Sequence, residues 1–418
     1  MRTARLAVAL LAILAVTGCQ APMEEPQLDG SIAIEGETIS VSPEPVYAGV
    51  RTVAEADVPA PERISVLPNA SAFRSLPGFS GGNLPRFYEV LGFVNETVPN
   101  GSALERMENG ATYNTGLIYI LPAADADPAS TEWVLAHEFG HYVNLQLGRV
   151  SDLGAKLGTS TDESYVAGAL REGATVFTTD TYLQRYGNRT EPTAPMYERL
   201  LSTLPAGEYT RFSLSKYVHG YRYVSNRVND PSELDTVFSQ PPTTSEQLLH
   251  GYLPDEEPPA ALNVTVNESD SWRVSRTDRL GEAFLRYALE NGVATDRAVE
   301  AAAGWGVDRL YYLQPDGEGH TSYAWTFRWD DAANASEFEQ TLEAYLDERG
   351  DRRGDVWTMM AQSSAAIRSP SDRTTVVLLG NRTLVSETTV TAAAEGHVRL
   401  DLPDGSNAEN QSSERSDQ

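Results

Sequence analysis

The sequence has one cysteine, two lysines and no apolar run long enough to cross a membrane. These shortages exclude internal disulfides and a transmembrane helix, and they indicate an unusual surface charge. Cys19 is the only cysteine, so the chain cannot form an internal disulfide. Residues 6–16 form an unbroken apolar run of 11 residues. This run is too short to be a transmembrane helix, because a helix needs roughly 20 residues to cross a bilayer. Lysine occurs only at Lys156 and Lys216 among 32 basic residues, against 59 acidic ones.

The charge balance predicts the setting in which the protein works. Its formal net charge is −27 at pH 7. A strongly acidic, lysine-poor surface keeps a protein soluble where concentrated salt screens charges over only about 3 Å. We therefore expect a halophilic, archaeal source. Such a surface repels nucleic acid and anionic lipid headgroups, so we expect neither as a partner. A monomer is expected.

The N-terminal residues are typical of a secreted lipoprotein. A basic start with Arg2 and Arg5 precedes the apolar run, which predicts a signal peptide over residues 1–18. The run ends in Val16-Thr17-Gly18-Cys19, which resembles a lipobox. We expect Cys19 to carry a lipid that holds the mature chain on the outer face of the cell membrane.

Potential glycosylation sites agree with an extracellular location. The sequence contains nine Asn-x-Ser/Thr sequons, each of which is a weak signal by itself. They begin at Asn69, Asn95, Asn100, Asn188, Asn263, Asn267, Asn334, Asn381 and Asn410.

Composition divides the rest of the chain into segments. Residues 19–60 are rich in Pro, Glu, Ser and Ala, and we expect them to form a flexible tether. Residues 404–418 are small and polar, which predicts a disordered tail. The stretch between them is long enough for one large domain or two smaller ones. We predict a larger domain over residues 61–295 and a C-terminal α/β region over residues 296–403.

Local patterns predict both helices and strands, so the expected fold class is α+β. Residues 115–121 are apolar and rich in β-formers, which predicts a strand that ends at Pro122. Asp127 and Pro128 predict the start of a helix that runs to Leu147. Further helices are predicted at 161–186, 84–93, 195–204, 281–291 and 336–348, and further strands at 309–313, 323–329 and 374–379.

The strongest motif is His137-Glu138-Phe139-Gly140-His141, on the helix that begins near residue 128. His137 and His141 are four residues apart, so they lie on one helix face and can share a metal ion. Neutral imidazole suits Zn²⁺. Glu138 is placed to take a proton from a metal-bound water. The residues around the motif are apolar, and burying these side chains without a partner would be costly. The motif therefore predicts a zinc site.

A catalytic zinc needs a third protein ligand and an open position for water. Glu172 is the predicted third ligand, because it lies among apolar residues midway along the helix at 161–186 and needs a counter-charge there. Gly173 would let the two helices approach closely. One alternative is that Glu172 pairs with a nearby arginine. Arg171 is adjacent in the sequence but points elsewhere on a helix. Another is that Asp162 or Glu163 is the ligand, although both fit capping and dipole roles.

The motif and the later glutamate resemble the gluzincin arrangement of zinc peptidases. The strand at 115–121 resembles the zincin edge strand, which holds an extended peptide by β-addition. More closely, the chain resembles haloarchaeal surface lipoproteins of peptidase type, which have bacterial relatives. The resemblance covers about residues 60–345, and its main segments are residues 136–141, 170–174, 241–250 and 304–309.

The resemblance implies a zincin-like catalytic domain over residues 61–295, Zn²⁺ as the cofactor, and Glu138 as the general base. It implies a peptide or protein substrate and names no particular one. Many gluzincins place an aspartate four residues after the glutamate ligand to orient a zinc-bound histidine. That position is Val176 here, so either another group does this work or the site is weaker.

A peptidase also needs a donor for the oxyanion of the tetrahedral intermediate, usually Tyr, His or Arg. We predict His250 for this role and Tyr223 as the second choice. His250 lies in one of the resembling segments. Tyr223 lies in the segment 216–223, which fits a tyrosine-rich packing face equally well.

Together these features predict a cell-surface zinc metallopeptidase. Two alternatives stay open. One is a surface lipoprotein that keeps zinc for structure or binding and has no turnover. The other is a glycosylated surface lipoprotein without a metal. A structural zinc is normally closed by four protein ligands, so a fourth protein ligand would favour the first alternative.

Overall fold

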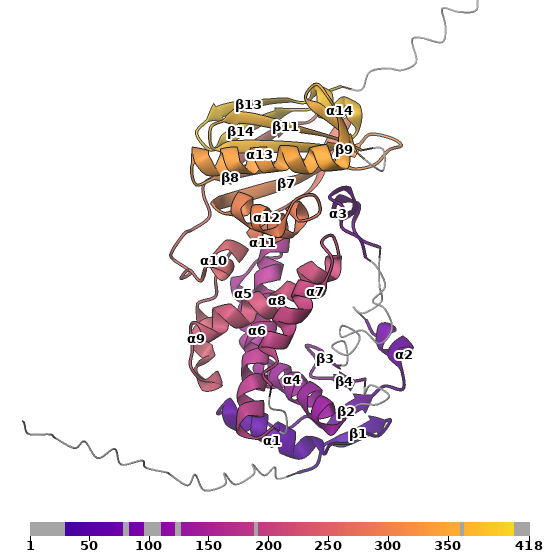
Figure 1. Ribbon diagram of the computed structural model, residues 1–418, viewed down its shortest axis with the longest axis vertical. Coiled ribbons are helices and arrows are strands. Elements are labelled where there is room, and N and C mark those ends of the chain that lie inside the picture. Colours follow the sequence, from indigo (N-terminus) through magenta and orange to yellow (C-terminus); the bar gives the residue numbers. More distant parts are fainter. Residues whose placement is uncertain are drawn as a thin grey trace, which may run out of the picture.

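The computed structural model describes residues 30–77, 83–95, 110–121, 127–187, 191–359 and 363–404. The predicted signal peptide at 1–18, the predicted lipid site Cys19 and residues 405–418 of the predicted tail lie outside these ranges. Figure 1 shows a largely helical half, built mostly from the earlier part of the chain, below a half rich in strands from the later part. The fold class is α+β, as predicted. Within the described ranges, no helix is long and apolar enough to cross a membrane.

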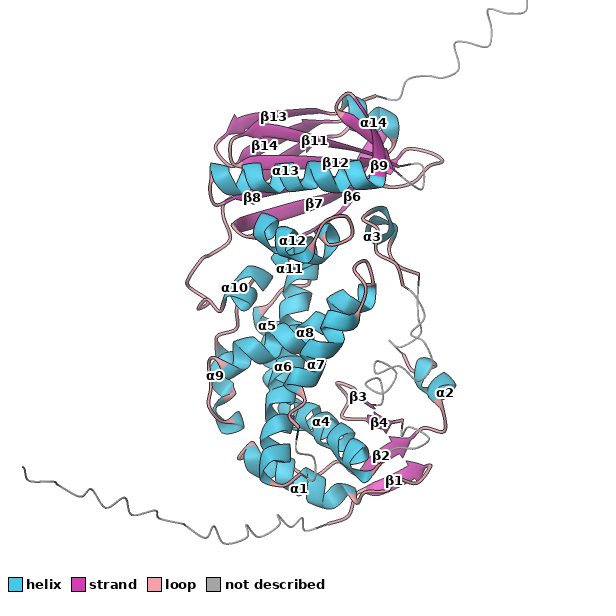
Figure 2. Cartoon of the chain, viewed as in Figure 1, coloured by secondary structure: helices cyan, strands magenta, loops and turns pink. Residues whose placement is uncertain are grey.

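A small sheet lies at the far end of the helical half (Figure 2). Its strands follow the order β1 (Ala33–Gly36), β2 (Arg63–Val66), β4 (Ile118–Ile120) and β3 (Gly110–Thr112). The first three run parallel, and β3 is antiparallel to β4. The strand predicted at 115–121 is β4, but it is shorter and lies inside the sheet. The expectation that it forms the edge was wrong, because β3 holds that position. A strand of three residues shows no period that sequence could reveal.

Residues 30–60 differ from the flexible tether that composition predicts. They contain β1 and helix α1 (Pro43–Val53), and Tyr47 and Val50 on α1 are fully buried. The Tyr47 ring meets the Phe139 ring edge-on, with centroids 5.2 Å apart. Proline suits the first turn of a helix, and the apolar residues that follow recur at helical spacing. The Pro-Glu-Pro sequence therefore marks a helix start rather than an unfolded segment.

Three helices form the centre of the helical half: α4 (Pro128–Gln146), α6 (Thr161–Arg185) and α8 (Tyr209–Ser225). The predictions at 127–147 and 161–186 are confirmed by α4 and α6. Asp127 caps α4 by accepting from the Ser130 amide, and Ser160 and Glu163 form a capping box at the start of α6. These local bonds satisfy free backbone amides in the first turn and fix where each helix begins.

Glycines set how closely α6 approaches its neighbours. A Cβ at Gly173 would overlap the backbone of Gly220 on α8, and a Cβ at Gly220 would overlap the backbone of Ala169 on α6. The close approach predicted at Gly173 is present, but its partner is α8 rather than the motif helix. On α4, Gly140 faces Thr175 of α6.

Gly220→Ala is expected to lower the free energy of unfolding by about 1–3 kcal/mol, because the new methyl meets backbone that cannot rotate away. The measurement is denaturant unfolding in high salt. Gly154→Ala is the control, since Gly154 lies on a helix with open space around it. This control should be neutral or stabilising by up to about 1 kcal/mol. Equal stability of wild type and Gly220→Ala would contradict the close crossing of α6 and α8.

Shorter helices complete this half and connect it to the sheets. The helices predicted at 84–93, 195–204 and 281–291 correspond to α3, α7 and α11. The set is α2 (Ala70–Arg74), α3 (Arg86–Val90), α5 (Arg149–Lys156), α7 (Ala194–Thr203), η1 (Pro231–Glu233), α9 (Asp235–Ser239), α10 (Ser245–His250), α11 (Gly281–Leu289) and α12 (Thr295–Ala302).

The later half is built on a seven-stranded antiparallel sheet. Helix α13 (Ala332–Arg349) and α11 and α12 pack on one face, and a smaller sheet of β13 (Thr389–Ala394), β14 (His397–Asp401) and β5 (Asn263–Asn267) covers the other (Figure 2). The large sheet has the order β6 (Trp272–Asp278), β7 (Trp305–Pro315), β8 (Ser322–Trp329), β12 (Thr374–Gly380), β11 (Ser363–Ser371), β10 (Val356–Met359) and β9 (Gly350–Arg353). The strands predicted at 309–313, 323–329 and 374–379 and the helix predicted at 336–348 are confirmed. They lie in β7, β8, β12 and α13.

The later half begins before residue 295, where the sequence predicts the boundary, because β5 and β6 already belong to its sheets. Both are edge strands with exposed polar residues, which gives a weak sequence signal.

Two buried carboxylates connect the halves. Asp308 on β7 accepts from the backbone amides of Leu280 and Gly281 at the start of α11, and from the indoles of two tryptophans. Asp162 at the start of α6 accepts from the Ser245 amide at 2.8 Å. α11 and α10 are thereby fixed to the sheet and to α6 respectively.

Candidate metal centre

The structure brings the three predicted metal ligands together. His137 and His141 lie one turn apart on α4, and Glu172 lies midway along the adjacent α6. Glu172 Oε2 is 3.1 Å from His141 Nε2 and 3.6 Å from His137 Nε2. Among the described residues, these three form the group of His, Cys, Asp and Glu whose ligand atoms all lie within 4.8 Å of one another.

This arrangement fits a tetrahedral zinc ion. Zinc bonds of about 2.0–2.1 Å at tetrahedral angles place neighbouring ligand atoms about 3.3 Å apart, and the two measured distances lie on either side of that value. Among the described residues, no donor is aligned to form a hydrogen bond with the buried Glu172 Oε2. A carboxylate oxygen left this way would be costly, and a cation between the three atoms would satisfy it. The Nε2 atoms face this position, which leaves each Nδ1 free for a supporting bond.

The three alternatives that the sequence offers at Glu172 differ from what the structure shows. Within the described residues, Glu172 Oε2 lies next to the Nε2 atoms of the two histidines, and no ion pair joins Glu172 to Arg171. Asp162 binds the Ser245 amide and lies 3.1 Å from Arg279 Nε. Glu163 closes the capping box at Ser160. The capping role that the sequence suggests for Glu163 is thus observed, and Asp162 joins α6 to the region of α10 and α11.

Thr175 supplies the supporting bond that the missing aspartate leaves open. Its hydroxyl lies 3.1 Å from His141 Nδ1. Thr175 follows Glu172 by three residues, so both lie on the α6 face that meets α4. Val176 is fully buried in the apolar core of the helical half. The residue that supports His141 therefore follows Glu172 by three positions, whereas the aspartate of many gluzincins follows by four. The sequence predicts that another group must do this work but does not single out Thr175, because a threonine inside a helix carries no distinguishing signal.

Glu138 is buried beside the histidines, under the edge strand. Thr112 on β3 donates to Glu138 Oε2 at 2.7 Å, and the Gly110 backbone lies so close that a Cβ there would overlap the carboxylate. Burial raises the pKa of Glu138 to about 7, His137 and the Thr112 hydrogen bond oppose the rise, and Glu172 adds to it. A cation held by the three ligands would favour the charged form. A carboxyl whose pKa lies near neutrality is suited to general acid and base work.

Tyr217 on α8 also reaches this centre. Its ring lies nearly parallel to the His137 ring, with centroids 6.0 Å apart. Burial raises the pKa of its phenol well above the usual value, and the charges of Glu172 and Glu138 add to this effect. Tyr217 lies in the tyrosine-rich segment 216–223 that the sequence suggested, but a different tyrosine was chosen there. If the segment is drawn as a helix, Tyr217 and Tyr223 fall on different faces, so only one of them can face the histidines.

The two predicted oxyanion donors have their contacts elsewhere. His250 lies on α10 with its Nε2 3.1 Å from Glu282 on α11. The Tyr223 hydroxyl bonds the Tyr252 carbonyl at 3.4 Å, and Arg227 lies over its ring. Neither side chain joins His137, His141 and Glu172 in the structure. Tyr223 follows Tyr217 by six residues, about 9 Å further along the helix, which carries it into the core shared with the later half.

His250 lies instead in an acidic region. Glu246, on the same short helix, is only 3 % exposed. Burial raises its pKa to about 9, and the negative charges of Glu282 and Asp330 contribute to the rise. Folded Glu246 therefore holds a proton at pH 7, whereas a glutamate in the unfolded chain is ionised.

Glu246→Gln is expected to stabilise the protein at pH 7 by on the order of 2 kcal/mol, because folding then needs no proton uptake. The raised pKa means that the contribution of Glu246 to stability is complete below about pH 4.5 and is lost as the pH rises towards 9. The gain from the substitution should therefore vanish near pH 4. Denaturant unfolding at both pH values measures it, with the exposed Asp255→Asn as the control. A gain of the same size at both pH values would contradict the raised pKa.

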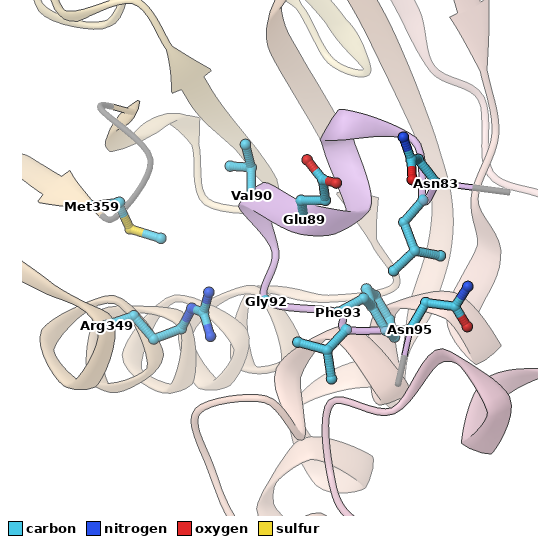
Figure 3. Close-up of a pocket in the computed structure, with 10 residues that line it drawn as sticks. Asn83, Glu89, Val90, Gly92, Phe93, Asn95, Arg349 and Met359 are labelled. Atoms are coloured by element: carbon cyan, nitrogen blue, oxygen red, sulfur yellow. The ribbon is translucent and has the colours of Figure 1, made fainter. Parts of the chain in front are cut away.

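A separate pocket lies where α3 meets the end of α13. Figure 3 shows Glu89 and Val90 on α3 and Arg349 and Met359 from the later half around it. Its volume is about 480 Å³. The α3 segment connects the helical half to the sheet. There the Phe87 ring packs against the Tyr323 ring, with centroids 4.8 Å apart. The pocket shares no residue with the candidate metal centre.

The comparisons with known proteins concern the later half of the chain. Residues 271–392 match the family described as "Domain of unknown function (DUF8575)". No curated protein and no solved structure matches the chain. The family match runs from the start of β6 into β13 and therefore covers most of the seven-stranded sheet together with α11, α12 and α13. The residues of the candidate metal centre lie outside the matched part of the chain.

Proposed function

We propose that this protein is a zinc-dependent metallopeptidase of the gluzincin type, held at the outer face of the cell membrane by a lipid on Cys19. The observation that carries the proposal is the meeting of His137, His141 and Glu172 around one point, with the buried Glu138 beside them. Three ligands leave a tetrahedral zinc with one open position, which is the arrangement of catalytic zinc sites. The resemblance to haloarchaeal surface lipoproteins supports the same reading.

The residues of this chain would divide the chemistry as follows. His137, His141 and Glu172 would hold the zinc, and Thr175 would keep His141 in its orientation. When bound, zinc supplies a water of lowered pKa and polarises the carbonyl of the substrate. Glu138 would accept a proton at its carboxylate and release it to the leaving amine. The Thr112 hydroxyl holds the Glu138 carboxylate at 2.7 Å and fixes where that proton is taken up.

The edge strand β3 is the proposed position of the peptide substrate. Among the described residues β3 pairs with β4 on one side, and no strand pairs with its other side. An extended peptide can add there as a further strand. Gly110 and Thr112 of β3 both contact Glu138, so a peptide along this edge would pass the general base. We propose a peptide or protein as the substrate, a monomer as the active form, and no nucleic-acid partner.

A cleavage assay tests this proposal. Purified protein in high salt is incubated with a peptide library, either zinc-loaded or after chelation and removal of the metal. The expected result is cleavage by the zinc-loaded protein, loss of cleavage on chelation, and recovery when about one equivalent of zinc is returned. A fully zinc-loaded protein that cleaves nothing would favour the non-catalytic alternative.

A further inference from the structure

The two histidines of the centre are supported differently. His141 Nδ1 has the Thr175 hydroxyl at 3.1 Å. His137 Nδ1 is buried, and no group in the described part of the chain forms a hydrogen bond with it. A metal-bound histidine usually donates its second ring nitrogen to a carboxylate, carbonyl or water, and this bond fixes the orientation of the ring. Something other than a hydrogen bond must therefore hold the His137 ring.

Tyr217 provides a packing surface for that ring. Its own ring lies at 19° to the His137 ring, with centroids 6.0 Å apart. Tyr197 of α7 also stacks on Tyr217, with ring centroids 4.7 Å apart and an interplanar angle of 25°. Tyr197 is 3 % exposed, so it cannot easily move aside. The Tyr217 ring therefore lies nearly parallel both to the buried Tyr197 ring and to the His137 ring.

Tyr217 also lies close enough to a second ligand of the centre for its phenol to feel that ligand's charge. The negative charge of Glu172 adds to the burial that raises the pKa of the Tyr217 phenol. Tyr217 therefore lies beside two of the three ligands, with its ring stacked on His137 and Glu172 within electrostatic range. The helix that carries Tyr217 is fixed against α6 by the crossing of Gly173 and Gly220.

We propose that Tyr217 is the positioning residue of the metal centre and takes the place of the hydrogen bond that His137 lacks. The proposal rests on the proposed function only in requiring that the centre binds zinc, and it does not require turnover. Tyr221, one turn further along α8, provides a matched comparison. Its ring faces Phe177, with centroids 6.3 Å apart, and its charge neighbours are Asp180 and Glu198 rather than the ligands.

The test is the zinc affinity of the full chain in high salt, measured by competition with a chelator of known affinity. Tyr217→Leu is expected to weaken zinc binding by about 10- to 100-fold, the range typical when a group that supports a metal ligand is lost. Tyr217→Phe keeps the ring that stacks on His137, so its zinc affinity should stay within about twofold of wild type. Tyr221→Phe and Tyr221→Leu should bind zinc like wild type. Cobalt substituted for zinc should show an altered visible spectrum in Tyr217→Leu alone.

The outcomes separate this proposal from the proposed function. Wild type that binds no zinc overturns both. Wild type that binds zinc, with Tyr217→Leu within about twofold of it, overturns the role of Tyr217 and leaves the zinc site standing. If thermal unfolding shows that Tyr217→Leu does not fold, Tyr217→Met decides, because it also removes the ring, and a zinc affinity within about twofold of wild type overturns the proposal.

Discussion

Glu138→Gln is expected to lower the rate of peptide cleavage by about 10²- to 10⁴-fold while zinc binding stays unchanged. The amide has nearly the same shape as the carboxylate and keeps an oxygen that can accept from Thr112. It cannot accept a proton, so it cannot act as the general base. Glu138 contributes no ligand atom to the group formed by His137, His141 and Glu172, and zinc affinity should therefore hold.

The measurement is the cleavage rate of wild type and variant, both zinc-loaded, on the same peptide library. Glu132→Gln is the matched control, because Glu132 is a buried glutamate on the same helix and accepts from the Tyr182 hydroxyl at 2.8 Å. An amide at that position still accepts this bond, so activity should be retained. Equal cleavage by wild type and Glu138→Gln would refute the proton transfer assigned to Glu138.

The second large effect concerns metal binding. Glu172→Gln is expected to weaken zinc binding by at least about 100-fold, since loss of second-shell partners alone costs about 10- to 100-fold. The substitution removes the negative charge that faces both Nε2 atoms at 3.1 and 3.6 Å. An amide oxygen is a much poorer zinc ligand than a carboxylate.

Glu163→Gln is the control for this effect, because Glu163 lies on the same helix and was the other glutamate that the sequence offered as a ligand. Glu163 caps the start of α6, so its substitution should lower stability slightly and leave zinc affinity intact. The two variants are compared by titration with a competing chelator in high salt. Zinc binding that survives in Glu172→Gln and fails in Glu163→Gln would show that the third ligand is misassigned.

The parts of the fold that sequence predicts are those with strong local signals. The capped ends of α4 and α6 and the apolar runs of β8 and β12 are of this kind, because caps and long apolar segments act within a few residues. Helix α1 was missed because its proline-rich start resembles a tether, and only packing against α4 shows it to be buried. The three-residue strand β3 and the edge strands β5 and β6 were missed because their stability comes from pairing with distant residues.

The candidate centre divides in the same way. His137, Glu138 and His141 lie within one turn of a helix, so the sequence alone places them together. The apolar residues around Glu172 favour it as the third ligand over Asp162 and Glu163. Thr175 and Tyr217 depend on how α6 meets α4 and α8, which no local pattern states. His250 was predicted from residue type and from the resembling segment at 241–250, and Tyr223 from residue type. The tertiary structure places the contacts of both near α10 instead.

The measurement that tests the central claim most directly is the zinc content of the purified full chain in high salt. Wild type is expected to hold about one zinc per chain, and His137→Ala well below half of that, because removal of a ligand opens the site. Less than about half an equivalent in wild type, unchanged in His137→Ala, would contradict the metal centre and the peptidase proposed from it.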